Sequence, residues 1–133
     1  MFDRKKQPPI KSLIAPGTRI EGHVTFSEGL RIDGELIGDV RAADGHRSIL
    51  VISETATVTG AVHADHVIIN GHVTGPVVSG ELLELQPKAV ISGDVTYRTL
   101  EMHQGATIAG VLRPLTGDES AEKPTLKLAA NNP

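Results

Sequence analysis

Six histidines are the side chains here best suited to acid–base or metal chemistry, because imidazole titrates near neutral pH and binds metals. His63 and His66 form an HxxH pattern, and His23 and His72 each sit inside a similar five-residue phrase. The chain has no cysteine, and no Asp or Glu pair at ligand spacing completes a site with these histidines. No Ser/His/Asp arrangement is recognisable. We therefore expect no catalytic residue, no metal, no cofactor and no enzyme activity.

The composition narrows the class of protein. The chain of 133 residues is 39% hydrophobic, which predicts one folded domain, and its net charge of −3 gives no basic field for nucleic acid. No nucleotide motif is present. The absence of cysteine fits a reducing compartment, and neither a secretory signal nor an apolar run of transmembrane length is visible. We therefore expect a protein without nucleotide or nucleic-acid partners.

Three zones differ in composition. Residues 1–15 carry an apolar pair, a basic cluster and two prolines, which predicts a flexible N-terminal tail. Residues 16–115 are repetitive and form the expected folded domain. Residues 116–133 are polar and small and contain proline, which predicts a disordered C-terminal tail.

One five-residue phrase recurs through the repetitive body, with glycine at its centre and an apolar residue at each end. Its copies are IEGHV (20–24), IDGEL (32–36), LIGDV (36–40), VTGAV (58–62), INGHV (69–73), VTGPV (73–77), ISGDV (91–95) and IAGVL (108–112). Apolar residues alternate with a period of two and many are β-branched, which indicates short strands rather than helices.

The spacing of the phrases gives the architecture. Glycines taken once per turn, from Gly22 to Gly110, are separated by 16, 22, 15, 18 and 17 residues, and the long interval contains AADGHRS (42–48), which we interpret as a loop insertion. A second column, from Leu30-x-Ile32 to Leu100-x-Met102, keeps the same period. Since the phrase always reads forward, the strands stack in parallel. The sequence predicts an all-β triangular solenoid of about six coils, roughly 29 Å long at 4.8 Å per layer.

Side chains alternate between the two sides of a strand, and this alternation, here called parity, predicts which residues of a phrase point inward. The first and fifth residues, such as Ile20 and Val24, point inward, and the second and fourth, such as Glu21 and His23, face water. The central glycine is expected at the position of a third inward side chain, where two walls approach closely and the chain can bend, because glycine has no Cβ and reaches positive φ. The same parity places His23, His63 and His72 on the outside, in different coils. Trimeric β-helix enzymes of the acyltransferase or γ-class carbonic anhydrase type are the alternative reading, but this chain lacks their strict six-residue repeat.

The ends of the predicted rod are the expected site of function. Neither end has a helix or polar segment to cap it, so each exposes unpaired backbone groups and an apolar cross-section. Uncapped ends predict end-to-end self-association. The residues that we expect at this polymer interface are Ile20, Val24, Phe26, Ile108, Val111 and Leu112.

The first residues have the pattern of a small membrane anchor. Met1 and Phe2 form an apolar tip, and Arg4, Lys5 and Lys6 form a basic collar that suits an anionic membrane surface. One copy would bind weakly, whereas a polymer would bind through many copies.

Several segments resemble the bactofilins, a family of bacterial polymer-forming cytoskeletal proteins. They are IAPGTRIEGHV (14–24), LRIDGELIGDV (30–40), ADHVIINGHVTGPV (64–77) and ISGDVTYRTLEMHQGATIAGVL (91–112). The resemblance implies a right-handed β-helix that polymerises without nucleotide into non-polar filaments through contacts between like ends. It also implies a cytoplasmic scaffold at the inner membrane that positions cell-wall or morphogenesis proteins, with MFDRKK as its membrane-targeting peptide. A third reading is a small adaptor whose tails recruit partners.

Overall fold

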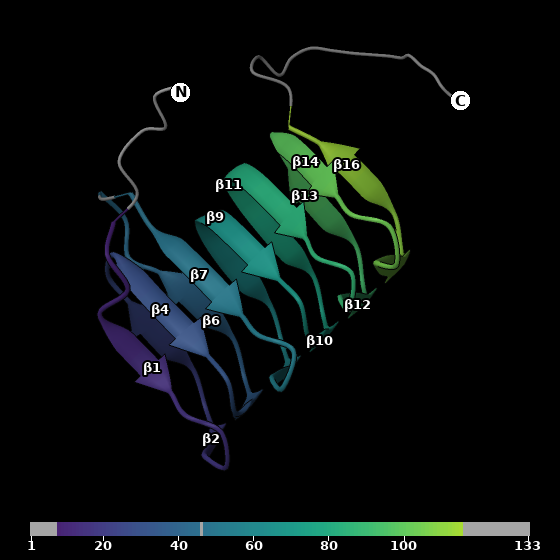
Figure 1. The fold of residues 1–133 in the computed structure, drawn as a ribbon. Coiled ribbons are helices and arrows are strands. Elements are labelled where there is room, and N and C mark those ends of the chain that lie inside the picture. Colours follow the sequence, from purple (N-terminus) through teal and green to yellow (C-terminus); the bar gives the residue numbers. More distant parts are fainter. Residues whose placement is uncertain (1–7, 46, 116–133) are drawn as a thin grey trace.

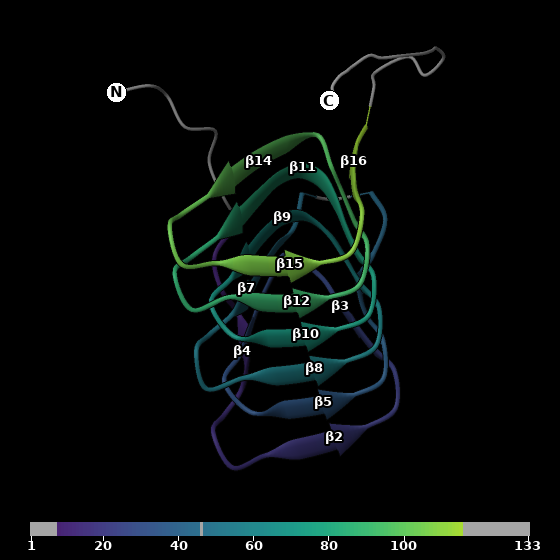
Figure 2. The ribbon, with the colours of Figure 1, turned by 90° about the vertical axis from the view of Figure 1, so that its right-hand side faces the viewer.

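The computed structural model describes residues 8–45 and 47–115, and within these ranges the chain forms parallel β-strands and no helix. The strands wind into a right-handed solenoid of six coils, which Figure 2 shows as a rising stack from β2 to β15. The predicted fold class is therefore confirmed. Each coil contributes one strand segment to each of three faces, which gives the rod a triangular cross-section.

Face one lies toward the viewer in Figure 1. It contains β1 (Ser12–Ile14), β4 (Gly29–Ile32), β7 (Ile49–Ile52), the second half of β9 (Val62–Ile69), the second half of β11 (Val77–Leu85) and β14 (Thr99–Met102). Face two contains β2 (Arg19–Glu21), β5 (Glu35–Ile37), β8 (Thr57–Thr59), β10 (His72–Thr74), β12 (Val90–Ser92) and β15 (Thr107–Ala109). Face three contains β3 (Val24–Phe26), β6 (Val40–Ala42), the first halves of β9 and β11, β13 (Val95–Tyr97) and β16 (Leu112–Pro114).

The core consists of columns of aliphatic side chains that run along the rod axis. One column on face one contains Leu30, Leu50, Val67 and Leu83, all buried and in register from coil to coil. Burying each such side chain contributes about 1.5–3 kcal/mol. The second column predicted from the sequence is therefore part of the core, and the repeat period reflects this stacking.

The glycines lie elsewhere than parity suggested. Six of them stack at the corner between faces two and three, outside the strands, and Gly38, Gly60, Gly75 and Gly93 have positive φ there. A Cβ on any of these four would overlap the carbonyl oxygen of the glycine one coil earlier. The predicted close approach and positive φ are therefore confirmed, whereas the predicted inward position was wrong, because the glycines lie where the chain turns the corner between two strands. Gly34 and Gly71, from similar phrases, occupy a different corner, between faces one and two.

Two boundaries predicted from the sequence, those of the loop insertion and of the N-terminal tail, can be compared with the structure. The long interval corresponds to a loop between β6 and β7, so the predicted insertion is confirmed. The solenoid, however, begins earlier than residue 16, because Ser12–Ile14 forms β1 and pairs with β4. This strand lies within the segment expected to be a flexible tail, and it is ordered because Ile14 packs into the core.

Candidate self-association interface at the two ends

The histidines do not gather into a site in the described part of the chain. His23 and His72 are exposed on different coils, and His63 is half-buried between the buried Val62 and Ala64 of β9, so all three have the predicted outward position. His66 is buried, and its backbone N–H donates to the carbonyl of Ser48 at 3.0 Å. His63 and His66 thus lie on either side of the corner between faces three and one, so their side chains are in different environments.

The structure brings together one cluster of titratable groups that sequence reasoning missed. Glu84, Glu101 and His103 place their ligand atoms within 4.8 Å of one another, and His103 Nε2 lies 3.6 Å from Glu84 Oε2. Glu84 and Glu101 are neighbours because β11 and β14 pair in register, although they lie in successive coils. Surface carboxylates stack in this way in any solenoid, so the cluster by itself carries no metal assignment.

Backbone pairing stops at the first and sixth coils. Within the described residues, β1, β2 and β3 each pair only with the next coil, and β14, β15 and β16 each pair only with the preceding one. Six strand edges are therefore open to another chain. The six residues predicted for the polymer interface lie on these strands, or beside one in the case of Val111, in two groups at opposite ends of the rod.

The N-terminal end is largely closed over its own apolar side chains. Phe26 on β3 and Ile14 on β1 are each only 7% exposed and belong to the core cluster. Ile20 and Val24 are half-buried. The exposed apolar side chains near this end are those of Ile10, just before β1, and of Leu13, which has the outward position in register with Arg31. Phe26 therefore serves chiefly as a core residue of the isolated rod.

The C-terminal end leaves its apolar side chains in water. Met102 is 45% exposed, Val111 52% and Leu112 42%, and Ile108 is half-buried. Leu112 is in register with the fully buried Val95 of the preceding coil, so it has the inward position that parity predicted. It is exposed because no further described coil covers it. Met102 was not among the predicted interface residues. The sequence does contain a signal for it, because Leu100-x-Met102 is the last member of the second column.

The hydrogen-bond ladder identifies backbone donors at this end. At the glycine corner, each coil donates to the next, as in the bonds from Gly93 N–H to Ala109 O at 3.0 Å and from Val95 N–H to Val111 O at 2.9 Å. The equivalent groups of the sixth coil are the N–H groups of Gly110 and Leu112. Within the described residues no coil follows to accept from them, so an incoming strand edge can supply the acceptors.

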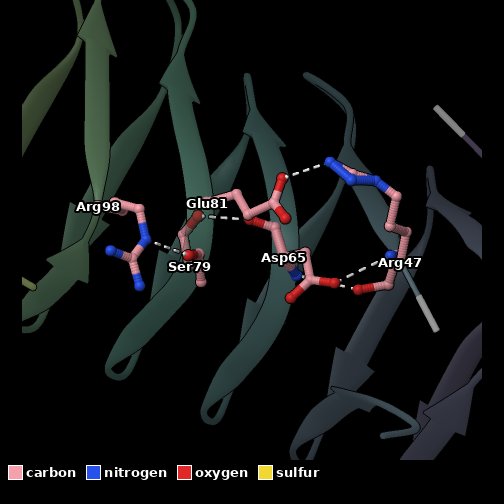
Figure 3. Close-up of polar contacts among 7 residues, drawn as sticks. Arg47, Asp65, Ser79, Glu81 and Arg98 are labelled. Atoms are coloured by element: carbon pink, nitrogen blue, oxygen red, sulfur yellow. Dashed lines mark hydrogen bonds and ion pairs between the residues drawn. The ribbon is translucent and has the colours of Figure 1, made fainter. Parts of the chain in front are cut away.

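A polar network keeps the interior coils in register between the two ends (Figure 3). At the corner between faces three and one, Asp65 N–H donates to Ser48 Oγ at 2.9 Å, and Ser79 Oγ donates to the Asp65 carbonyl at 2.8 Å. On the exposed surface beside these hydrogen bonds, Arg47 and Glu81 form an ion pair with an N···O distance of 2.9 Å. Ser48 and Ser79 are buried, so the bonds compensate for their loss of water.

The predicted membrane anchor lies outside the described residues, since Met1, Phe2, Arg4, Lys5 and Lys6 all precede residue 8. The predicted C-terminal tail, 116–133, also lies outside them. In the part of the chain that the structure covers, no helix is long and apolar enough to cross a membrane.

Comparison with known proteins agrees with this geometry. The family model described as bactofilin, polymer-forming cytoskeletal, matches residues 12–113, a range that runs from the first residue of β1 nearly to the end of β16. A similar curated protein is bactofilin BacO of Myxococcus xanthus (strain DK1622), which is 24% identical over 109 residues, 82% of this chain and 83% of that protein. No solved structure matches the chain.

Proposed function

Because this chain belongs to the bactofilin family of polymer-forming cytoskeletal proteins, we propose that it assembles end to end into filaments through its first and sixth coils. The observation that carries the proposal is the set of six unpaired strand edges, together with the exposed Met102, Val111 and Leu112. A joint between two ends pairs the edges and removes these side chains from water. Each half-exposed side chain contributes roughly 1 kcal/mol.

Contacts between like ends account best for the difference between the two ends. Two C-terminal ends bury the exposed apolar set of both rods at once, whereas a head-to-tail joint places it against the more closed N-terminal end. We therefore propose a tight joint between C-terminal ends and a weaker joint between N-terminal ends, which gives filaments without polarity. Assembly needs no nucleotide, since all of its interactions are backbone pairing and apolar burial.

Purified protein without nucleotide tests the assembly. We expect filaments by electron microscopy and a polymer fraction in a high-speed pellet, unchanged by added ATP or GTP. A rod that remains monomeric at high concentration in sedimentation velocity would contradict the proposal.

We further propose that the filaments lie at the inner membrane surface in the cytoplasm, held by Met1, Phe2, Arg4, Lys5 and Lys6, and position cell-envelope or morphogenesis proteins there. Each basic residue contributes about 1 kcal/mol near an anionic leaflet, and a filament multiplies the contacts.

A variant lacking residues 1–6 tests the membrane contact. It should polymerise normally but no longer co-sediment with anionic liposomes, and neutral liposomes serve as the control for charge. Undiminished binding to anionic liposomes would exclude this anchor.

A further inference from the structure

Face one carries an outward column of side chains with opposite charges toward its two ends. The column runs through Arg31 in coil 2, Val51 in coil 3, Ile68 in coil 4 and Glu84 in coil 5, in register along β4, β7, β9 and β11. These strands lie side by side toward the viewer in Figure 1. Leu13 and Glu101 continue the column in coils 1 and 6.

The middle of this column is apolar although it faces outward. Val51 and Ile68 are half-buried, and they line a shallow groove of about 510 Å³ with Arg31, Asp33, Asn70 and Gln86 among its other walls. Outward positions on a solvated sheet normally hold polar residues. An apolar pair flanked by a cation on one side and an anion on the other is instead the pattern of an interface.

Over coils 2 to 5 the column is complementary to itself. A two-fold axis that lies in the plane of the contact, across the rod and level with the midpoint between Val51 and Ile68, brings Arg31 opposite Glu84 of a second copy and Val51 opposite its Ile68. Isologous contacts of this kind are the common form of association between identical chains. We infer that face one is a lateral docking surface for a second copy of this chain, with the two rods antiparallel.

The charged groups remain available for such a contact. Arg31 Nε binds Asp33 Oδ1 at 2.9 Å, but its side chain is 50% exposed and its guanidinium carries further N–H donors. Glu84 accepts from Gln86 Nε2 at 3.2 Å and lies 3.6 Å from His103 Nε2, with its side chain 21% exposed, so these neighbours hold a partly exposed carboxylate in place.

The other faces lack this symmetry. On face three the outward column contains Arg41, His63 and Arg113 and no acidic residue. On face two the outward Arg and Glu side chains, Arg19, Glu21 and Glu35, all lie in the first two coils. When two rods pair antiparallel over their full length, neither of these faces places a cation opposite an anion, so only face one pairs with itself by charge along the whole rod.

The size of the face determines when pairing occurs. Strands of about three residues on a rod of about 29 Å offer on the order of 300 Å² per copy, well below the roughly 800 Å² per partner of a stable interface. Isolated rods should therefore pair weakly, and filaments should pair strongly through many copies. In this respect the inference rests on the proposed end-to-end assembly.

Charge reversal with rescue tests the inference. Low-speed centrifugation collects bundles of filaments, and high-speed centrifugation collects all filaments. Arg31→Glu should lower the low-speed pellet at least five-fold without changing the high-speed pellet, and Glu84→Arg should do the same. The double variant Arg31→Glu/Glu84→Arg should restore bundles. Arg41→Glu, in the same coil but on face three, is the matched control and should behave as wild type.

Rescue would not come from within one rod, since Arg31 and Glu84 lie three coils apart, about 14 Å along the axis. Bundling by Arg31→Glu at the wild-type level, or failure of the double variant to restore it, would overturn the inference. If the high-speed pellet is empty for wild type, the proposed filament fails instead. In that case, sedimentation equilibrium at millimolar concentration compares the self-association of wild-type rods with that of Arg31→Glu rods. Equal self-association of the two would again overturn lateral docking.

Discussion

The two ends of this rod are built from the same repeat but expose different chemistry. At the N-terminal end, Ile14 and Phe26 are buried within their own coil, whereas at the C-terminal end Met102 and Leu112 are nearly half exposed. Among residues 8–45 and 47–115, each end presents three strand edges without a partner strand. Backbone pairing is thus available at either end, whereas inward-facing apolar side chains are left nearly half exposed only at the C-terminal end of the described chain. Equal numbers of open strand edges therefore do not make the joints at the two ends equally strong.

The largest effect is expected at the closed end. Phe26→Arg places a charge in the core cluster and should destabilise the rod by about 3 kcal/mol, contrary to a purely interfacial role for this residue. Urea unfolding measures the loss. Thr25→Arg, one residue earlier and exposed, is the matched control and should change stability by less than about 0.5 kcal/mol. If Phe26→Arg unfolds at the same urea concentration as wild type but forms no filaments, Phe26 acts at the polymer interface and not chiefly in the core.

The open end should respond in assembly rather than stability. Leu112→Arg should reduce the polymer pellet more than ten-fold while leaving the circular dichroism and Tm unchanged, because the side chain is already exposed in the rod. Under the like-end arrangement, weak dimers joined at their N-terminal ends should survive. Thr107→Arg, exposed on the outer side of the same coil, serves as the control. Full polymerisation of Leu112→Arg would show that the C-terminal contact is misplaced.

A smaller effect distinguishes like-end joints from head-to-tail joints. A Cβ added at Gly22 would meet nothing within 4 Å in the rod, whereas a Cβ added at Gly38, the next glycine of the stack, would overlap the Gly22 carbonyl oxygen. In a head-to-tail joint that continues this stack, a methyl group added at Gly22 would contact the neighbouring rod. We therefore expect Gly22→Ala to retain dimers through C-terminal ends in sedimentation velocity. Gly45→Ala, also at positive φ and in open space, controls for backbone strain. Monomers alone for Gly22→Ala would indicate head-to-tail assembly.

The smallest effect is a pH dependence near the closed end. A hydrogen bond from Ser53, and then Arg31 beside it, hold the pKa of Asp33 below its ordinary value of 3.8, against partial burial that raises it. The folded rod therefore binds this proton less readily than the unfolded chain. The stabilisation is present above pH 3.8 and is lost as the pH falls through the lower folded pKa. Asp33→Asn should differ slightly from wild type in urea unfolding at pH 7 and less at pH 3. A difference that grows at low pH would contradict this sign.

The repeat made much of the fold predictable. The glycine and Leu-x-Ile columns gave the period, the number of coils and the inward residues, because parallel stacking repeats the same environment every coil. Parity did not predict the corner position of the glycines, since it says which way a side chain points and not where a strand ends. For the same reason, similar phrases around Gly34 and Gly60 occupy different corners.

The site was less predictable than the fold. The sequence indicated residues on both ends but not the difference between them, because the burial of Phe26 depends on packing within its coil. The network of Ser48, Asp65 and Ser79 joins residues from three different coils, and nothing local in the sequence pairs them. The self-complementary column on face one likewise becomes visible only once the register is known.

The orientation of the rod in the polymer tests the central claim most directly. If rods join end to end, their strands lie across the filament, and the ladder repeats along the filament axis. Cryo-electron microscopy or fibre diffraction of aligned filaments, prepared without nucleotide, should show a strong meridional spacing of about 4.8 Å. The rods should succeed one another about every 29 Å, six layers of that spacing. A 4.8 Å spacing on the equator instead would show rods lying across the filament and would contradict assembly through the two ends.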